Sequence, residues 1–316
     1  MAWIAGFGRS KGLRWERRGV TASQIPLGDL QREYARIRPE IDRAIERVLR
    51  RGCFILGDEV EAFEAERADY CGAAHSVAVG NGTDAIQLAL RAAGVGPGDR
   101  VLEVGAGAGT LTRGLAATGA AVVSYEIDER LRPVLEEVVG DRVELRFADA
   151  RRIDPSLLEG RWVMVANLPY NVGTPLVLDL LRHAHRIERF VVMLQREAVE
   201  RLAARPGTKA YGVPSVVAQL HGTVQVAFRV APSVFLPAPK VESAVAVIER
   251  RPADPDAAQA VALAAAAFGQ RRKMLRRSLA SRFDDPAGAI TAAGLDPSAR
   301  AEDLAPADYL RLAHAR

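Results

Sequence analysis

The sequence predicts an α/β fold, in which a largely parallel sheet lies between helices. From Arg100 to Ala203 short apolar runs alternate with amphipathic segments, which is typical of a parallel sheet with helices on both faces. Before this region apolar residues recur at helical spacing, and residues 257–316 are rich in alanine without a strand pattern. We therefore expect a helical N-terminal extension and a C-terminal helical lobe on either side of the sheet.

The composition is that of a folded protein without a membrane span. The chain has 316 residues, 49% of them hydrophobic and 26% charged, which is enough for a sizeable core. No apolar run is long enough to cross a membrane, and the N-terminus lacks a secretory signal, so we expect a cytoplasmic protein. The two cysteines, Cys53 and Cys71, form no CxxC pattern and have no nearby histidine pair. Neither a disulfide framework nor a metal site is expected.

The N-terminal part is expected to be mostly helical. Residues 1–24 are polar, rich in glycine and arginine and aperiodic, which is typical of a mobile extension. Leu30–Arg51 carries apolar residues three and four positions apart, as an amphipathic helix does. A second helix is expected over Asp58–Tyr70, a short strand over Val77–Val79 and a third helix over Thr83–Ala93.

The sheet region can be divided into its elements in order. Strands are expected over Val101–Val104, Ala121–Tyr125, Val143–Phe147, Trp162–Ala166 and Phe190–Leu194. Helices are expected between and after them over Thr110–Thr118, Arg130–Val139, Pro175–Arg182 and Ala198–Ala203. Two further strands, Val224–Val230 and Ala244–Glu249, lie close in the sequence and can pair. Pro252–Asp256 is typical of a linker.

Glycines and carboxylates follow the first three strands. Gly105, Gly107 and Gly109 come after a buried strand at the start of a helix, where backbone can approach a ligand and the helix offers free N–H groups. Glu126 follows the second strand, where a carboxylate can accept both hydroxyls of a ribose. Asp149 is expected at the end of the third strand, where it could accept from an adenine amine. A tight turn and solvated carboxylates are the alternative interpretation.

The motif Asn167-Leu168-Pro169-Tyr170 follows the fourth strand and indicates methylation of an exocyclic adenine amine. The lone pair of that amine is delocalised into the ring, so the amine is a poor nucleophile. An amide oxygen of Asn167 and a backbone carbonyl next to the proline can accept its two N–H bonds and localise the lone pair. Tyr170 can stack on an extruded base. With an activated sulfonium methyl the protein supplies alignment and electrostatics. A proline-containing turn without a role in catalysis is the alternative.

The densest positive charge runs from Arg271 to Arg282 without an acidic residue. On a helix, Arg272 and Arg276, and likewise Lys273 and Arg277, lie four positions apart and form a basic stripe. Such stripes neutralise phosphates and position RNA without reading its sequence. A solvated surface face is the alternative.

From about Gly98 to the C-terminus the chain resembles the KsgA-type ribosomal RNA small-subunit adenine N6-dimethyltransferases. The resemblance lies in the segments VLEVGAGAGTLT, YEID, FADA, NLPYN, MLQREAVERL, GTKAYG, FLPAPKVESAV and FGQRRKMLRRSL. It implies a Rossmann-like seven-stranded S-adenosylmethionine methyltransferase sheet that dimethylates two adjacent adenines of small-subunit (16S) ribosomal RNA. It also implies a monomer without a metal, with this RNA or the assembling small subunit as partner. The related erythromycin-resistance methylases share NLPY-like motifs, but the last two segments favour the small-subunit enzymes.

The resemblance also implies roles for individual residues. Cofactor contacts are implied at Glu103, Gly105, Gly107, Glu126, Asp149 and Asn167. The residues implied around the target base are Asn167, Pro169, Tyr170 and Phe235. RNA contacts are expected at Lys240, Arg271, Arg272, Lys273, Arg276 and Arg277.

The N-terminal part departs from that family. A segment resembling F-G-Q-N-F-L, which closes over the methionine end of the cofactor in the family, is missing, and Ala74–Gly82 stands in its place. About Ile25 to Asp99 instead resembles the N-terminal part of pyridoxal-phosphate-dependent sugar aminotransferases, in IPLGDLQREY, FILGDEVEAFE and VAVGNGTDAIQLALRAAGVGPGD. In those enzymes the turn matching Gly82–Asp84 holds the cofactor phosphate. The four lysines are Lys11, Lys209, Lys240 and Lys273. None lies where a Schiff base would need it, so pyridoxal phosphate is not expected.

Four regions and two functions are therefore predicted. The regions are a mobile extension (1–24), an aminotransferase-like, mostly helical fragment (25–98), a methyltransferase catalytic domain (99–250) and a helical RNA-binding lobe (251–316). We expect Thr83–Ala93 to substitute for the helix that normally precedes the first strand. The first function is ribosomal RNA adenine N6-dimethylation, which loss of the F-G-Q-N-F-L segment would impair. The second is a catalytically deficient chimera that only binds ribosomal RNA or the ribosome.

Overall fold

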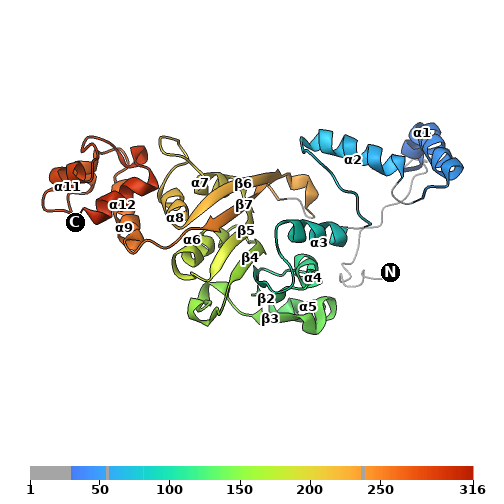
Figure 1. The fold of residues 1–316 in the computed structure, drawn as a ribbon, viewed down its shortest axis with the longest axis horizontal. Helices are drawn as coiled ribbons and strands as arrows, with labels where there is room; N and C mark the ends of the chain where they lie inside the picture. Colours follow the sequence, from blue (N-terminus) through green and yellow to red (C-terminus); the bar gives the residue numbers. More distant parts are fainter. Residues whose placement is uncertain (1–29, 55–56, 81, 236–238, 316) are drawn as a thin grey trace, which may run out of the picture. The chain divides into compact units, whose positions relative to one another are not determined.

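The computed structural model describes residues 30–54, 57–80, 82–235 and 239–315. The chain forms two compact units, Met1–Ala78 and Val79–Arg316 (Figure 1). The expected extension over residues 1–24 and the first residues of the aminotransferase-like fragment lie outside the described residues. No helix in the described ranges is long and apolar enough to cross a membrane.

The described residues of the first unit contain two helices, as predicted. They are α1 (Leu30–Arg51) and α2 (Asp58–Cys71). Arg47 and Glu59 join them in an ion pair with an N···O distance of 2.7 Å, and Arg51 pairs with Asp58.

The strand predicted over Val77–Val79 is wrong. These residues form no strand with any described part of the chain. The N–H of Ala78 instead donates to the carboxylate of Glu64 in α2 at 2.7 Å. A side chain thus takes the backbone group that a neighbouring strand would need.

The second unit is built on a seven-stranded mixed sheet, which confirms the predicted fold class. Its strands are β1 (Arg100–Val104), β2 (Ala121–Glu126), β3 (Val143–Phe147), β4 (Trp162–Asn167), β5 (Ile187–Gln195), β6 (Gly222–Val230) and β7 (Ser243–Arg250). Their order is β3-β2-β1-β4-β5-β7-β6. The first five strands are parallel, and β7 is antiparallel to both β5 and β6. From β1 the chain adds strands on one side of the sheet as far as β3 and then continues with β4 on the other side of β1. Ligands bind in such folds at the point between β1 and β4 where the strand order changes direction.

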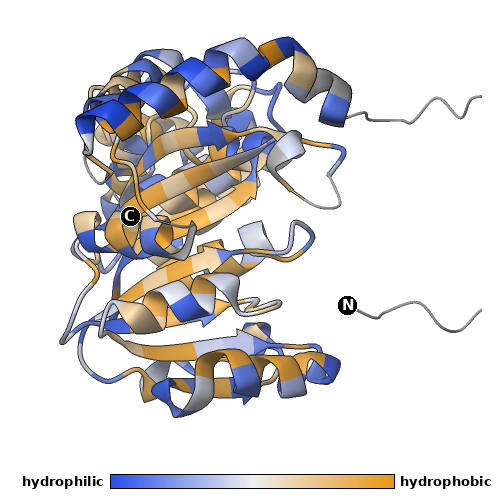
Figure 2. Ribbon diagram, turned by 90° about the vertical axis from the view of Figure 1, so that its right-hand side faces the viewer, coloured by the Kyte–Doolittle hydropathy of each residue, from blue (hydrophilic) through white to orange (hydrophobic). Residues whose placement is uncertain are grey.

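Helices cover both faces of this sheet. Helices α3 (Gly82–Ala92), α4 (Thr110–Ala117) and α5 (Arg132–Val139) share one apolar core with the sheet. The opposite face packs against α6 (Gly173–His183), α7 (Arg196–Leu202) and α8 (Val213–His221). In β1, Val101 faces the first core and Leu102 and Val104 the second, as the alternation of side chains along a strand requires. Figure 2 shows the hydrophobic residues concentrated on the strands.

Helix α3 belongs to the second unit, although it lies within the expected 25–98 fragment. Leu90 and Val95 are buried in the same core as Leu115 of α4. The guanidinium of Arg189 in β5 donates to the carbonyl of Ala93, just beyond the end of α3. Arg189 also pairs with Glu249 of β7 at 2.6 Å. The end of α3 is thus tied to the middle of the sheet.

The C-terminal lobe is helical, as predicted. It contains α9 (Ala257–Gly269), α10 (Leu275–Ser278), α11 (Pro286–Ala292) and α12 (Pro306–His314). Two buried tyrosines hold it in place. The hydroxyl of Tyr211, which precedes α8, donates to the carbonyl of Leu304 in the lobe at 2.8 Å, and within the lobe the hydroxyl of Tyr309 donates to the carbonyl of Ala301 at 2.7 Å.

The single helix on which the cations between Arg271 and Arg282 would form a basic stripe does not form. Helix α9 ends at Gly269, residues 271–273 form a turn and bend, and α10 has 4 residues. The N–H of Lys273 donates to Gln270 at 2.8 Å, and that of Leu275 to Ala299 at 2.7 Å. Met274 pairs with Arg300 in an isolated bridge. Tertiary pairing therefore extends the chain where local spacing suggested a helix.

Candidate active site

The turn between β1 and α4 is open to a ligand because of its glycines. Gly105, Gly107 and Gly109 have φ angles of 82°, 57° and 82°, a region that favours glycine. A methyl group on Gly105 would lie 3.5 Å from both the carbonyl oxygen of Asn167 and the ring of Pro169. The glycine turn and the Asn-Leu-Pro-Tyr motif, far apart in the sequence, therefore lie side by side.

Glu126 connects this turn to the end of β2. One oxygen of its carboxylate accepts from the N–H of Gly107 at 2.9 Å, and the other from Ile127 and Asp128 at 2.8 and 2.9 Å. A carboxylate has about four acceptor positions. The three N–H bonds hold the group in place and leave capacity for a hydroxyl donor.

Glu103 is fully buried one residue before the end of β1. Burial raises the pKa of its carboxyl group, opposed by the hydroxyls of Ser124 and Thr112 and aided by the negative charge of Glu126. The Ser124 hydroxyl donates to its Oε2 at 2.5 Å, while Oε1 has no hydrogen-bond partner among the described residues. The structure thus places this predicted cofactor residue beneath the turn.

Asp149 lies two residues beyond β3, not at its end as predicted. Its side chain accepts from the N–H of Arg151 at 3.0 Å and caps the short helical turn Ala150–Arg152, which moves it past the strand. The Arg151 guanidinium also donates to it at 2.6 Å. These bonds lower the pKa of the Asp149 carboxyl to about 2. It is therefore an ionised acceptor near neutral pH.

The Asn-Leu-Pro-Tyr turn presents two acceptors beside the glycine turn. Asn167 is the last residue of β4, as predicted, and its side chain is exposed. The carbonyl of Pro169 accepts from Val172 and Gly173 at 3.2 and 2.9 Å, which begins α6. In the described ranges no donor bonds the carbonyl of Leu168. The Asn167 amide and the Leu168 carbonyl are therefore available.

Aromatic side chains come from two segments. The hydroxyl of Tyr170 lies 2.6 Å from the hydroxyl of Ser243 at the start of β7. Phe235 is half-buried where the chain leaves Pro232–Val234, and its N–H donates to the carbonyl of Pro232 at 3.2 Å. The hydrogen bond to Ser243 had no signal in the sequence that could have revealed it.

Arg271 differs from the other predicted RNA contacts. Its guanidinium pairs with Glu302 at 2.7 Å and donates to the carbonyls of Thr208 and Lys209 at 3.4 Å. This arginine therefore holds the loop before α8 against the lobe. The remaining predicted contacts are exposed, namely Lys240, Arg272, Lys273, Arg276 and Arg277.

An apolar cavity of about 680 Å³ reaches the same edge of the sheet. Asn167 and Val245 lie towards that edge, and Ile86 and Leu90 of α3 contribute a helical wall. Phe228 of β6 also lines the cavity and is 58% exposed.

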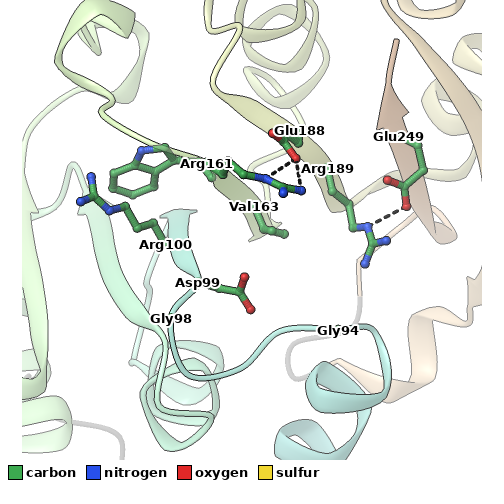
Figure 3. A pocket seen from close by; sticks show the side chains of 10 residues that line it. Gly94, Gly98, Asp99, Arg100, Arg161, Val163, Glu188, Arg189 and Glu249 are labelled. Carbon is green, nitrogen blue, oxygen red and sulfur yellow. Dashed lines mark hydrogen bonds and ion pairs between the residues drawn. The ribbon is translucent and has the colours of Figure 1, made fainter. Parts of the chain in front are cut away.

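A polar cavity of about 550 Å³ lies at the other edge, where the parallel strands begin (Figure 3). Its charges are largely matched. Arg161 pairs with Glu188 at 2.5 Å, and Arg189 with Glu249 at 2.6 Å. Since ligands of this fold bind at the carboxyl ends of the strands, the candidate site is the opposite edge.

One group in the described part of the chain has the composition of a metal site. Asp254, Asp256 and His314 bring their ligand atoms within 4.8 Å of one another. It joins the linker to α12 and lies outside the strand ends that form the candidate site.

The strand order, the glycine turn and the polar residues at the ends of β2 and β4 together define a Rossmann-like methyltransferase. A sequence profile of the ribosomal RNA adenine dimethylase family matches residues 81–315, and the chain belongs to this family.

Curated relatives and solved structures agree with this family. The chain is 48% identical over 234 residues to ribosomal RNA small subunit methyltransferase A of Phenylobacterium zucineum, covering 71% of this chain and 81% of that one. It is 42% identical over 242 residues to the protein of the same name from Leifsonia xyli, covering 72% and 86%.

Two solved structures share the fold. A dimethyladenosine transferase from Plasmodium falciparum has a TM-score of 0.62 at 23% identity, covering 73% of this chain and 93% of that chain. The 23S rRNA methyltransferase ErmE has a TM-score of 0.58 at 25% identity, covering 73% and 96%. The family match begins at residue 81, so it includes α3 as well as the region from Gly98.

Proposed function

We propose that this chain transfers methyl groups from S-adenosylmethionine to N6 of adenines in small-subunit ribosomal RNA. The observation that carries the proposal is the contact between two motifs. The backbone carbonyl of Asn167 and the ring of Pro169 lie against the glycine turn, so a nucleoside cofactor at one motif would meet an adenine at the other.

The residues at the strand ends fit this cofactor. Glu126 is held by three N–H groups with acceptor capacity for ribose hydroxyls, and Asp149 is an ionised acceptor for an adenine amine. Gly105 and Gly107 let backbone approach the ligand. The bound cofactor would supply a methyl group activated on sulfonium. Glu103 would support the turn from beneath rather than touch the ligand, because it is fully buried.

The Asn-Leu-Pro-Tyr turn would hold the target adenine. The Asn167 amide oxygen and the Leu168 carbonyl would accept the two N–H bonds of the amine and direct its lone pair towards the methyl group. The methyl carbon would leave the sulfur as it bonds to N6, so that the cofactor departs as a neutral thioether and the amine loses one N–H proton. A second cofactor molecule would supply the second methyl group, which would replace the other N–H. Pro169 restricts the turn, and Tyr170 and Phe235 would stack on the extruded base.

The RNA would be held by exposed cations in the lobe and beside the site. Arg272, Lys273, Arg276 and Arg277 lie on and just before α10, and Lys240 precedes β7. Cations of this kind position RNA through its phosphates. We assign catalysis to residues 99–250 and RNA binding to residues 251–316, in a cytoplasmic monomer that acts on the assembling small subunit without a metal.

We also propose that about Ile25 to Asp99 derives from a sugar aminotransferase without keeping its chemistry. The segments quoted above support the aminotransferase origin, and the positions of the lysines support the loss of the aminotransferase chemistry. Lys209, Lys240 and Lys273 all lie within the dimethylase match at 81–315, and Lys11 lies outside the described residues. Addition of pyridoxal phosphate should give no absorbance band of an internal aldimine; such a band would contradict this proposal.

The alternative is a catalytically deficient protein that binds ribosomal RNA, favoured by the absence of an F-G-Q-N-F-L segment. Methyl incorporation from labelled S-adenosylmethionine into undermethylated small subunits separates the two. We expect incorporation by the full chain and loss of it in Asn167→Ala. Equal incorporation by the two proteins would contradict the proposed methyltransferase activity.

A further inference from the structure

We infer that Ser243 is a positioning residue for the target base, because its hydroxyl fixes the ring of Tyr170. The inference rests on the proposed function, in which that ring stacks on the adenine. The two side-chain oxygens lie 2.6 Å apart although the residues are 73 positions apart in the sequence. A hydrogen bond of this length joins the turn after β4 to the start of β7.

The Ser243 end of this bond is anchored. Ser243 is fully buried and lies between Gln195 of β5 and Val230 of β6 in the register of the sheet. The preceding residue is fastened as well: the carbonyl of Glu242 accepts from the N–H of Arg196 at 2.9 Å, and their side chains form an ion pair. The hydroxyl therefore has a fixed position relative to the sheet.

The Tyr170 end needs such an anchor. Tyr170 is half-buried in a turn between β4 and α6, and its ring can rotate about two side-chain bonds. A hydrogen bond at the phenol oxygen fixes the far end of the ring and leaves its faces free for a base. Displacement of a reacting group by about 1 Å can cost about 100-fold in rate. A change in the orientation of the Tyr170 ring should therefore change the rate of the methyl-transfer step.

The Ser243 end of the bond lies away from the cofactor contacts proposed at the glycine turn, Glu126 and Asp149. The order of strands places β7 on the far side of β4 and β5 from β1, β2 and β3. Gly105 and Glu126 belong to the latter half of the sheet. Removing the Ser243 hydroxyl should thus change how the base is presented without changing how the cofactor binds.

The test compares kcat and the KM for S-adenosylmethionine in Ser243→Ala, Tyr170→Phe and the double variant, with undermethylated small subunits as substrate. Each single variant should lower kcat about 3- to 10-fold, the usual worth of one hydrogen bond, with the KM for the cofactor unchanged. The double variant should be no slower than the singles, because both remove the same bond.

The matched control is Ser215→Ala in α8. The Ser215 hydroxyl is equally buried and donates to the carbonyl of Arg201 at 2.6 Å. This control should lower Tm and leave kcat unchanged, so a general loss of packing would not imitate the expected result.

Three results would overturn the inference: a wild-type kcat in Ser243→Ala, losses that multiply in the double variant, or a kcat loss matched by Ser215→Ala. If Ser243→Ala does not fold, Tyr170→Phe removes the same bond from the partly exposed side, and a wild-type kcat in that variant overturns the inference alone. An unmodified chain that transfers no methyl group would instead contradict the proposed function.

Discussion

Ile86 of α3 and Gly114 of α4 lie so close together that a methyl group on Gly114 would come within 2.6 Å of the Ile86 Cγ2 atom. The contact joins a helix that precedes β1 to the helix that follows the glycine turn. Because α4 begins at this turn, the packing of α3 bears on the geometry of the proposed cofactor site. Helix α3 therefore packs as part of the second compact unit, Val79–Arg316.

Gly114→Ala should destabilise the protein. Replacing a helical glycine by alanine usually stabilises by about 0.5–1 kcal/mol. Here the opposing methyl group is attached to the β-carbon of Ile86 and cannot turn away freely, so the helices must separate. We expect a net loss of about 1–3 kcal/mol in the free energy of unfolding, as for other overpacked cores, measured by urea denaturation.

The control for this prediction is Gly269→Ala at the end of α9, where an added methyl group meets no atom within 4 Å. It should be neutral or stabilising. In an Ile86→Ala background the Gly114→Ala substitution should lose most of its cost. Equal stabilities of Gly114→Ala and Gly269→Ala would show that the two helices are not tightly packed.

Stability should fall between pH 6.5 and pH 4 because of His221. Burial, followed by the positive charge of Arg250, lowers the pKa of this histidine to about 4. The unfolded chain binds a proton at this residue near pH 6.5, while the folded chain does not. The unfolded state is therefore stabilised relative to the folded state as pH falls through this window. The slope from this residue is about 1.4 kcal/mol per pH unit. Its contribution is constant above pH 6.5.

The measurement is the free energy of unfolding across this range for the native chain and for His221→Gln. The variant should show a shallower fall, since a glutamine does not titrate. Parallel curves for the two proteins would contradict the prediction, because they would mean that the pKa of His221 is the same in the folded and the unfolded chain.

Asp149→Asn should weaken cofactor binding. Asparagine keeps the shape but loses the charge that strengthens a hydrogen bond to an amine. We expect the Kd for S-adenosylmethionine to rise about 10-fold, measured by calorimetry. Asp154→Asn is the control, because Asp154 makes the same type of turn by accepting from the N–H of Ser156 at 2.9 Å. A change of equal size in both variants would remove Asp149 from the site.

Arg271 and Arg272 should differ although they are neighbours. Arg272→Gln removes an exposed cation, so the dependence of RNA affinity on salt should become shallower by about one phosphate contact. Arg271→Gln breaks the pairing with Glu302 and should lower Tm while leaving that salt dependence unchanged. A shallower salt dependence in Arg271→Gln would return this arginine to the RNA contacts.

The elements that sequence predicted well are those whose pattern is local. The strands from β1 to β5 bury alternate residues or short apolar runs, and the polar residues that follow them needed only the rule that parallel strands end at one edge. Helix α8 was not predicted because none of its 9 residues is exposed, and the polar Ser215 and His221 are buried in it together with its apolar residues. A helix buried on all sides has no amphipathic period.

The remaining differences come from contacts between distant residues. Met274 is extended because it pairs with Arg300, and Arg271 is engaged in an ion pair with Glu302. The bond between Tyr170 and Ser243 joins the turn after β4 to the start of β7, which lies beyond β5 in the sheet. No periodicity or spacing within one segment carries information about such pairs.

Calorimetric titration of the full chain with S-adenosylmethionine tests the central claim most directly. The claim is that the glycine turn, Glu126, Asp149 and Asn167 form a cofactor site in a chain that has no F-G-Q-N-F-L segment. We predict that one cofactor binds per chain with a Kd in the micromolar range. A Kd of about 1 μM corresponds to a binding free energy of about −8.2 kcal/mol. A folded chain that shows no binding up to millimolar cofactor would contradict the claim.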